Sequence, residues 1–234
     1  SGGSLIKTPT YNVGLGYLAL QKLVDQNVST AVGYQAGRYA TGSYNTFVGG
    51  EAGQGGTTSA PFSSGTSNVA VGYQAFKGFT TSIHNVAVGL SSMRDNTTGN
   101  YNTALGNNSM RDNTTGGANT ALGYAAGFSL DGGNYNVVIG NGAGYSLAGV
   151  SNCILIGDQA GEFISNTNAN GTVVIGHEAG KALTSGAGNL AIGYQALQTH
   201  TTGLRNIAIG YGAMDDTDAG STSLGSTDNI FMGY

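Results

Sequence analysis

A short phrase, Asn-x-Ala-[Val/Ile/Leu]-Gly, recurs along most of this chain at a nearly constant interval. The glycines that close its copies, the degenerate copies included, fall at positions 16, 33, 49, 72, 89, 106, 123, 140, 157, 176, 193, 210, 225 and 233. Eight of the thirteen differences between successive positions equal 17. A fixed period of this kind is the signature of a repeat architecture, in which each unit packs against its neighbours. The repeat is defined most clearly by Gly33, Gly72, Gly89, Gly106, Gly123, Gly140, Gly157, Gly176, Gly193 and Gly210.

The residues inside each phrase alternate as in a β-strand. The positions three and one before the glycine are mostly Val, Ile or Leu, as in Val69 and Val71, and they share one face of a strand. The position between them is usually Ala, as in Ala70 and Ala104. A water-exposed strand face normally carries polar residues. The alanine stripe therefore predicts that another chain or layer packs closely against that face.

The remainder of each unit is rich in Thr, Asn, Ser, Asp and Gly, which are turn-forming residues. Each unit is therefore expected to contain a strand, a tight glycine bend, a short second strand and a polar turn. A unit this short cannot bury a core alone, but stacked copies can. The sequence predicts an all-β chain, a β-solenoid of about 14 coils with a ~17-residue repeat, roughly 65 Å long at ~4.8 Å per coil. The Asn that begins each phrase is expected to form an amide ladder from coil to coil.

The repeat also divides the chain. Residues 1–10 are assigned as a leader or linker, and residues 11–234 as a single β-solenoid domain. The step from Gly49 to Gly72 is longer than the others, and the excess places an insertion within residues 53–67, which contains Pro61 and Phe62. Insertions in solenoids protrude on one face and often carry binding. The insertion is therefore a candidate recognition segment.

Composition excludes several classes of protein. Only 9% of the residues are charged, and the net charge of −4 leaves no basic stripe for a nucleic acid. The apolar runs are much shorter than the ~20 residues of a transmembrane helix, so no membrane insertion is expected. The single cysteine, Cys153, cannot form an intrachain disulfide and is predicted to be a buried structural thiol.

No combination of residues points to catalysis. His84, His177 and His200 lie at different phases of the repeat, so they are not expected to share a metal ion. The chain has no Gly-x-Ser-x-Gly motif and no evident pair of nucleophile and base. We therefore predict that the protein is not an enzyme, with no catalytic residue, no cofactor and no metal ligand.

A tyrosine often follows the closing glycine. An exposed row of this kind can bind sugars or a receptor by stacking, or its rings can pack on one another from coil to coil. The candidate recognition residues are Pro61, Phe62, Tyr34, Tyr73, Tyr194 and Tyr211.

The phrase resembles the repeat of trimeric autotransporter adhesin heads, the YadA-like β-roll. The words Gly-Tyr-Gln-Ala at 33–36, 72–75 and 193–196, with Thr-Thr-Gly turns, are also similar to repeats of bacteriophage tail-fibre proteins. The resemblance covers about residues 11–234. It implies a parallel homotrimer with small residues at the contacts between chains, and an extracellular location on a virion fibre or a cell surface.

The resemblance leads to an expected function. The chain would be a structural or adhesive fibre segment, a rigid rod that holds a surface for a cell-surface glycan or protein receptor. One alternative is a self-assembling extracellular filament, whose subunits stack end to end through uncapped solenoid ends. A minor alternative is an ice-binding solenoid, which would need flat rows of Thr, whereas the Thr pairs here fall in expected turns.

Overall fold

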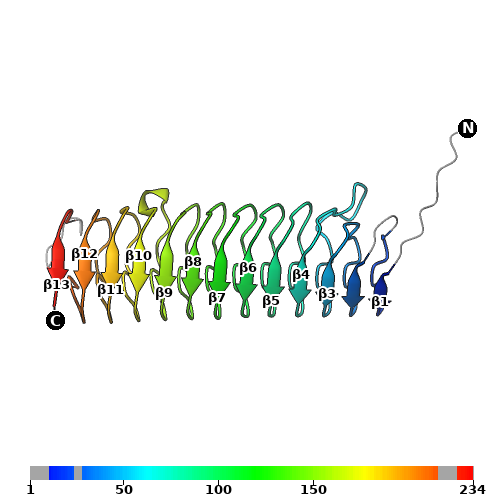
Figure 1. Ribbon diagram of the computed structural model, residues 1–234, viewed down its shortest axis with the longest axis horizontal. Coiled ribbons are helices and arrows are strands. Elements are labelled where there is room, and N and C mark those ends of the chain that lie inside the picture. Colours follow the sequence, from blue (N-terminus) through cyan, green and yellow to red (C-terminus); the bar gives the residue numbers. More distant parts are fainter. Residues whose placement is uncertain (1–10, 24–27, 216–225, 234) are drawn as a thin grey trace, which may run out of the picture.

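The structure, a computed structural model, describes residues 11–23, 28–215 and 226–233. These residues form a β-solenoid with thirteen strands side by side in one parallel sheet, ordered β1 to β13 (Figure 1). The predicted all-β solenoid and its repeat spacing are confirmed. The assigned leader, residues 1–10, and the predicted repeat glycine Gly225 lie outside the described residues. The strands are β1 (Val13–Leu15), β2 (Thr30–Val32), β3 (Thr46–Val48), β4 (Val69–Val71), β5 (Val86–Val88), β6 (Thr103–Leu105), β7 (Thr120–Leu122), β8 (Val137–Ile139), β9 (Ile154–Ile156), β10 (Val173–Ile175), β11 (Leu190–Ile192), β12 (Ile207–Ile209) and β13 (Ile230–Met232).

A glycine follows each strand because the backbone conformation and the neighbouring coil leave no place for a side chain. Gly106 has φ +140°, and a Cβ added to it would lie 2.2 Å from the carbonyl oxygen of Gly123 in the next coil. Side chains rarely adopt such a φ, and the neighbouring coil leaves no room for one. The repeat glycines thus allow the coils to stack closely.

The prediction of a second strand in each unit is wrong, because each described coil contains one strand. After the glycine, the chain forms a turn in which the second and fourth residues adopt left-handed conformations, as in Gln35 (φ 55°) and Gly37 (φ 59°). A left-handed residue at every second position prevents an extended strand. The turns are still joined from coil to coil, because the Gln35 N–H donates to Tyr17 O and the Gly37 N–H donates to Ala52 O.

The prediction that another chain or layer packs against the alanine stripe is confirmed for a layer, because turns of the same chain cover this face. The middle residues of β2 to β12, among them Ala70 and Ala104, are buried inside this chain's own coil. Opposite them lie equally buried small residues of the turns, such as Ala75 and Ser109. Because the coil is narrow at this level, only small side chains fit in most coils. No partner chain is needed to cover these alanines.

Larger core residues fill the wider part of each coil. Where the fourth residue after the repeat glycine is large, as in Met93 and Met110, that side chain is buried. Where it is a glycine, as in Gly144, a residue three positions later, Leu147, fills the space instead. The core is therefore continuous, although the large side chain comes from different repeat positions in different coils.

The predicted asparagine ladder is confirmed. Asn85 donates from its backbone N–H and from Nδ2 to Asn68 Oδ1, over 3.0 and 3.1 Å. Its Nδ2 also donates to Gly99 O, which ties the strand to the turn of the same coil. All of these groups are buried. Each asparagine amide therefore gives hydrogen-bond partners to buried backbone N–H and C=O groups that water cannot reach. Ser29, Cys153 and Thr172 replace Asn at three rungs.

The regular coils are interrupted at two described places. Residues between β3 and β4 form the predicted insertion, and β9 and β10 are separated by a short 3-10 helix, η1 (Thr167–Ala169). Both protrude from the same edge of the solenoid (Figure 1). None of the helical structure in the described ranges is long and apolar enough to cross a bilayer.

Candidate interaction surfaces

The outer face of the sheet is a long apolar surface of the described chain. It is formed by the first and third residues of each strand, which point away from the coil. These positions hold only Val, Leu, Ile, Met and Thr. Leu105 is 37% exposed and Leu122 is 45% exposed, although both are larger than the buried alanines beside them, Ala104 and Ala121. We call these positions the outer strip.

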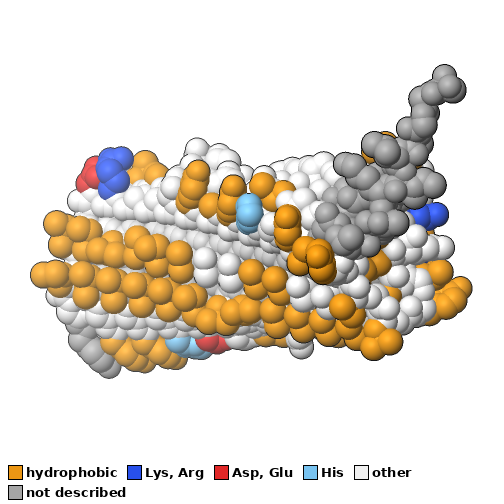
Figure 2. Space-filling model, turned by 45° about the vertical axis from the view of Figure 1, so that its right-hand side comes forward, with side chains coloured by type: hydrophobic (Ala, Val, Ile, Leu, Met, Phe, Trp, Pro, Cys, Tyr) orange, Lys and Arg blue, Asp and Glu red, His pale blue; other side chains and the backbone are white. Residues whose placement is uncertain are grey.

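The outer strip runs the length of the solenoid. Figure 2 shows hydrophobic side chains in rows along the long axis of the molecule. With thirteen strands at ~4.8 Å and a width of about 10 Å, the strip covers on the order of 600 Å². That area is at the upper end of the apolar patches that soluble monomers expose. The sequence contained the signal, because the two positions were recognised as one face, but that face was not recognised as the exposed one.

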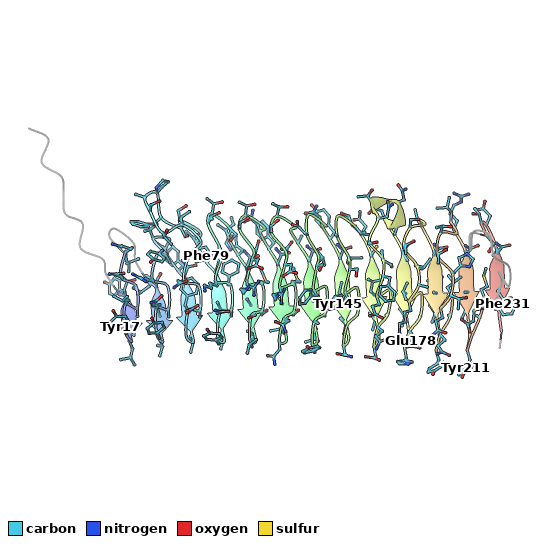
Figure 3. The ribbon with its side chains drawn as sticks, turned by 180° about the vertical axis from the view of Figure 1, so that it is seen from behind. Tyr17, Phe79, Tyr145, Glu178, Tyr211 and Phe231 are labelled. Atoms are coloured by element: carbon cyan, nitrogen blue, oxygen red, sulfur yellow. The ribbon has the colours of Figure 1, made fainter. Side chains whose placement is uncertain are left out.

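A second surface is the row of residues directly after the repeat glycines. Tyr17 and Tyr211 of this row lie along one edge of the solenoid, near the ends of the strands, and Glu178 lies along the same edge (Figure 3). Tyr194 stacks between His177 and Tyr211, with ring centroids 5.1 and 4.9 Å away. Both faces of the Tyr194 ring are therefore covered. In this part of the row, the structure shows the expected packing from coil to coil.

The row is different around Tyr34 and Tyr73. Tyr34 stacks on Tyr17 at 5.6 Å, but the next coil has Gly50 at this position, and Tyr73 follows one coil further on. Tyr34 and Tyr73 are 52% and 53% exposed. The row therefore lacks one ring between two exposed tyrosines, and we call this place the Gly50 gap.

Polar side chains surround the Gly50 gap. Gln35 Nε2 donates to the Tyr34 hydroxyl over 2.8 Å, and Gln74 Nε2 donates to the Tyr73 hydroxyl over 3.3 Å. Gln74 also donates to Glu51 Oε2 over 3.0 Å. The amides that hold the two rings were not identified from the sequence. The Gln in the Gly-Tyr-Gln words was a possible signal, because it sits beside each of these tyrosines.

The charged groups near the gap are paired. Lys77 Nζ lies 2.7 Å from Glu51 Oε2, and hydrogen bonds from Lys77 and then Gln74 lower the pKa of Glu51. Arg94 is paired with Asp95 at 2.7 Å, and the hydrogen bond to Asp95 raises the pKa of Arg94. An open groove of about 450 Å³ lies between these pairs and the insertion. Its walls include Gln54, Gln74, Lys77, Arg94 and Asp95.

The insertion exposes less of its candidate recognition residues than the sequence predicts. Phe62 is half-buried, because its ring stacks on Tyr39 at 6.2 Å and Lys22 lies over it at 5.6 Å. Pro61 is exposed. Neither residue lines the groove, where the insertion contributes Gln54, Gly55, Gly56 and Thr58. The structure thus places Tyr34 and Tyr73 on either side of one gap, but it does not bring Pro61 and Phe62 to them.

The remaining polar candidates are separate from one another. His84 stacks on Tyr101, His177 lies 3.1 Å from Asp158, and His200 is buried. Among the described residues, no three His, Cys, Asp or Glu side chains are placed to hold a metal ion. Cys153 is buried as predicted, and burial raises the pKa of its thiol, which keeps it protonated and unreactive.

Comparisons of the chain with protein-family models, curated proteins and solved structures give no match. The function is therefore argued from the two surfaces described above.

Proposed function

We propose that this chain is a non-enzymatic, elongated segment of an extracellular fibre or adhesin, assembled as a parallel homotrimer. The outer strip is the observation that carries the proposal. It is uncharged and largely apolar over all thirteen described strands, and burial of such a surface stabilises association.

The rigidity that such a role requires has a clear origin. Each coil is joined to the next by strand hydrogen bonds, by turn hydrogen bonds and by the asparagine ladder. Bending the rod would break several of these bonds at once. A stiff rod with apolar strips can associate lengthwise, and the rest of its surface stays available for a receptor on a virion fibre or a cell surface.

Three copies are proposed because the phrase resembles repeats of trimeric proteins. In this arrangement, the outer strips face a common axis and the tyrosine row lies at the edge of the sheet. The small residues are inside each coil rather than between chains, so the proposed contact uses Val, Ile and Leu where the resemblance implied alanine.

The test is the mass and shape of the protein in solution, by light scattering and negative-stain imaging over a concentration series. We expect a rod with three times the mass of the 23.5 kDa chain. A stable monomer at high concentration would overturn the assembly and, with it, the proposed role of the outer strip.

A second candidate is a filament whose subunits stack end to end. Phe231, the middle residue of β13, is 42% exposed, whereas the middle residues of β2 to β12 are buried. Inside the sheet, the large Phe47 of β3 lies between Ala31 and Ala70. If β13 paired with β1 of another copy, Phe231 would lie between Ala208 and the small Gly14. Filaments that lengthen with concentration would favour this candidate, and discrete rods would exclude it.

A further inference from the structure

The tyrosine row contains one place where a single coil without a ring, at Gly50, separates two tyrosines, and that place has the geometry of a stacking site. Gly50 lies between Tyr34 and Tyr73, and the backbone hydrogen bonds Glu51 N to Tyr34 O and Gln74 N to Gly50 O show that the three coils are in register. Two coil spacings of ~4.8 Å separate the tyrosines, about 10 Å in all. With each tyrosine ring over its own coil, a ring placed midway would be ~5 Å from each, within the range of favourable stacking, and the Tyr73 ring, whose Cδ2 lies 3.3 Å from a Cβ built at Gly50, has to shift slightly to admit it.

The same solenoid shows what fills such a space. Tyr194 lies midway between His177 and Tyr211, at centroid distances of 5.1 and 4.9 Å. That sandwich occupies the same position of the repeat as the Gly50 gap, three rings in three consecutive coils. At the gap, the middle ring is absent, Tyr34 and Tyr73 are each about half exposed, and one edge of the Tyr73 ring reaches over Gly50.

The rings that border the gap are held in place before any ligand arrives. Gln35 holds the Tyr34 hydroxyl, and Gln35 itself accepts a hydrogen bond from Gln54. Gln74 holds the Tyr73 hydroxyl and also contacts Glu51. These hydrogen bonds restrict the motion of both rings, which lowers the entropy cost of binding.

The polar groups at the gap select the kind of ring. A carboxylate offers about four acceptor positions and an ammonium offers three donors, so Glu51 and Lys77 retain hydrogen-bonding capacity beyond their mutual contact. Gln54 and Gln74 lead from the gap into the adjoining groove. A purely apolar aromatic ring would leave these groups unused, whereas the hydroxyls of a sugar ring can both donate to them and accept from them.

We propose that the Gly50 gap binds one neutral hexopyranose ring between Tyr34 and Tyr73, with neighbouring sugar units in the groove beside Gln74 and Lys77. This inference rests on the proposed function, because it names the ligand class of the fibre's recognition surface. The shallow, open site predicts weak binding of single sugars, with millimolar dissociation constants, strengthened by repetition in an oligomer.

The experiment is saturation-transfer difference NMR on the full chain with methyl β-D-glucopyranoside, methyl β-D-galactopyranoside and N-acetylglucosamine as probes, and with p-cresol as an aromatic probe. We expect saturation transfer to the ring protons of at least one sugar. In the variant Gly50→Tyr, which fills the gap with the repeat's own residue, we expect at least a tenfold weaker signal. A Cβ at Gly50 lies 3.3 Å from Tyr73 Cδ2, a contact that a small shift of this exposed ring relieves.

The matched control is Asn141→Tyr, which adds a tyrosine at the same repeat position outside the gap. It should bind the sugars as the wild type does, and circular dichroism should show both variants folded. The proposal is overturned if no sugar binds, if Gly50→Tyr binds as strongly as the wild type, or if only p-cresol binds. A trimeric rod that binds no sugar would retain the proposed assembly and lose this site, whereas a monomer that binds through the gap would do the reverse.

Discussion

The inside and the outside of the same strand follow opposite rules in this protein. In β6, Ala104 is fully buried and its neighbour Leu105, a much larger apolar side chain, is 37% exposed. Hydrophobicity alone would bury the leucine. The coil buries the alanine instead. At this level the strand and the turn that closes the coil lie close together, so only a small side chain fits between them. The width of the enclosed space therefore decides which face points inward, and the larger residues are left for contacts outside the coil.

The largest expected effect comes from the stacking of the coils themselves. Gly106→Ala should cost more than about 3 kcal/mol, because the strained φ alone costs roughly 1–3 kcal/mol and the new Cβ meets the Gly123 carbonyl oxygen at 2.2 Å. Urea unfolding followed by circular dichroism measures the loss. The control is Gly142→Asn, since Asn108 occupies the same repeat position with a similar φ. Equal stabilities of the two variants would contradict this account of the repeat glycines.

Charges on the outer strip should prevent assembly of the chains without unfolding the coil. We expect the double variant Leu105→Lys with Leu122→Lys to lower the mass in solution from that of a trimer to that of the 23.5 kDa chain and to leave the circular dichroism spectrum unchanged. Light scattering measures the mass. The control places the same charges at turn positions of the same region, Thr98→Lys with Thr115→Lys, and should remain assembled. If the control also dissociates, net charge rather than the outer strip governs assembly.

A volume change tests the comparison within one strand. Ala104→Leu should destabilise the fold by about 1–3 kcal/mol, because the filled interior cannot take three more carbon atoms. Leu105→Ala should cost less than about 1 kcal/mol of folding stability, because that side chain is partly exposed. Both values come from urea unfolding of the same preparation. A larger loss of stability from Leu105→Ala than from Ala104→Leu would mean that Leu105, and not Ala104, points into the coil.

The smallest effect is expected at the charged edge. Hydrogen bonds from Lys181 and then Gln195 lower the pKa of Glu178. A carboxyl group with a lowered pKa adds stability above its unfolded pKa of about 4.3, and this stability is lost as the pH falls through the folded pKa. Because the pair lies near the surface, the contribution is below about 1 kcal/mol. Unfolding midpoints of Glu178→Gln between pH 7 and pH 3 should fall less steeply than those of the wild type, and identical slopes would contradict the assignment.

Much of the candidate site was accessible from the sequence, but not its arrangement. The tyrosines after the repeat glycines were identified as recognition residues, and the absence of a ring at Gly50 can be read from the repeat once the coils are aligned. What could not be read was that stacking covers both faces of the Tyr194 ring, whereas no ring lies between Tyr34 and Tyr73 beside Gly50. That difference depends on the side-chain neighbours in adjacent coils, and on Gln35 and Gln74, which hold the two rings.

Four features follow from the sequence alone: the period, the stacking of short strands, the asparagine ladder and the place of the insertion. These features depend on local geometry and on the repetition of one unit, because equivalent residues of stacked coils must meet. Three others required the three-dimensional arrangement: the alanines lie inside the coil, turns replace the second strand, and Val, Ile and Leu form the outer strip. The inward direction of a three-residue strand is set by the space that the rest of its coil encloses, and no pattern within the strand records that space.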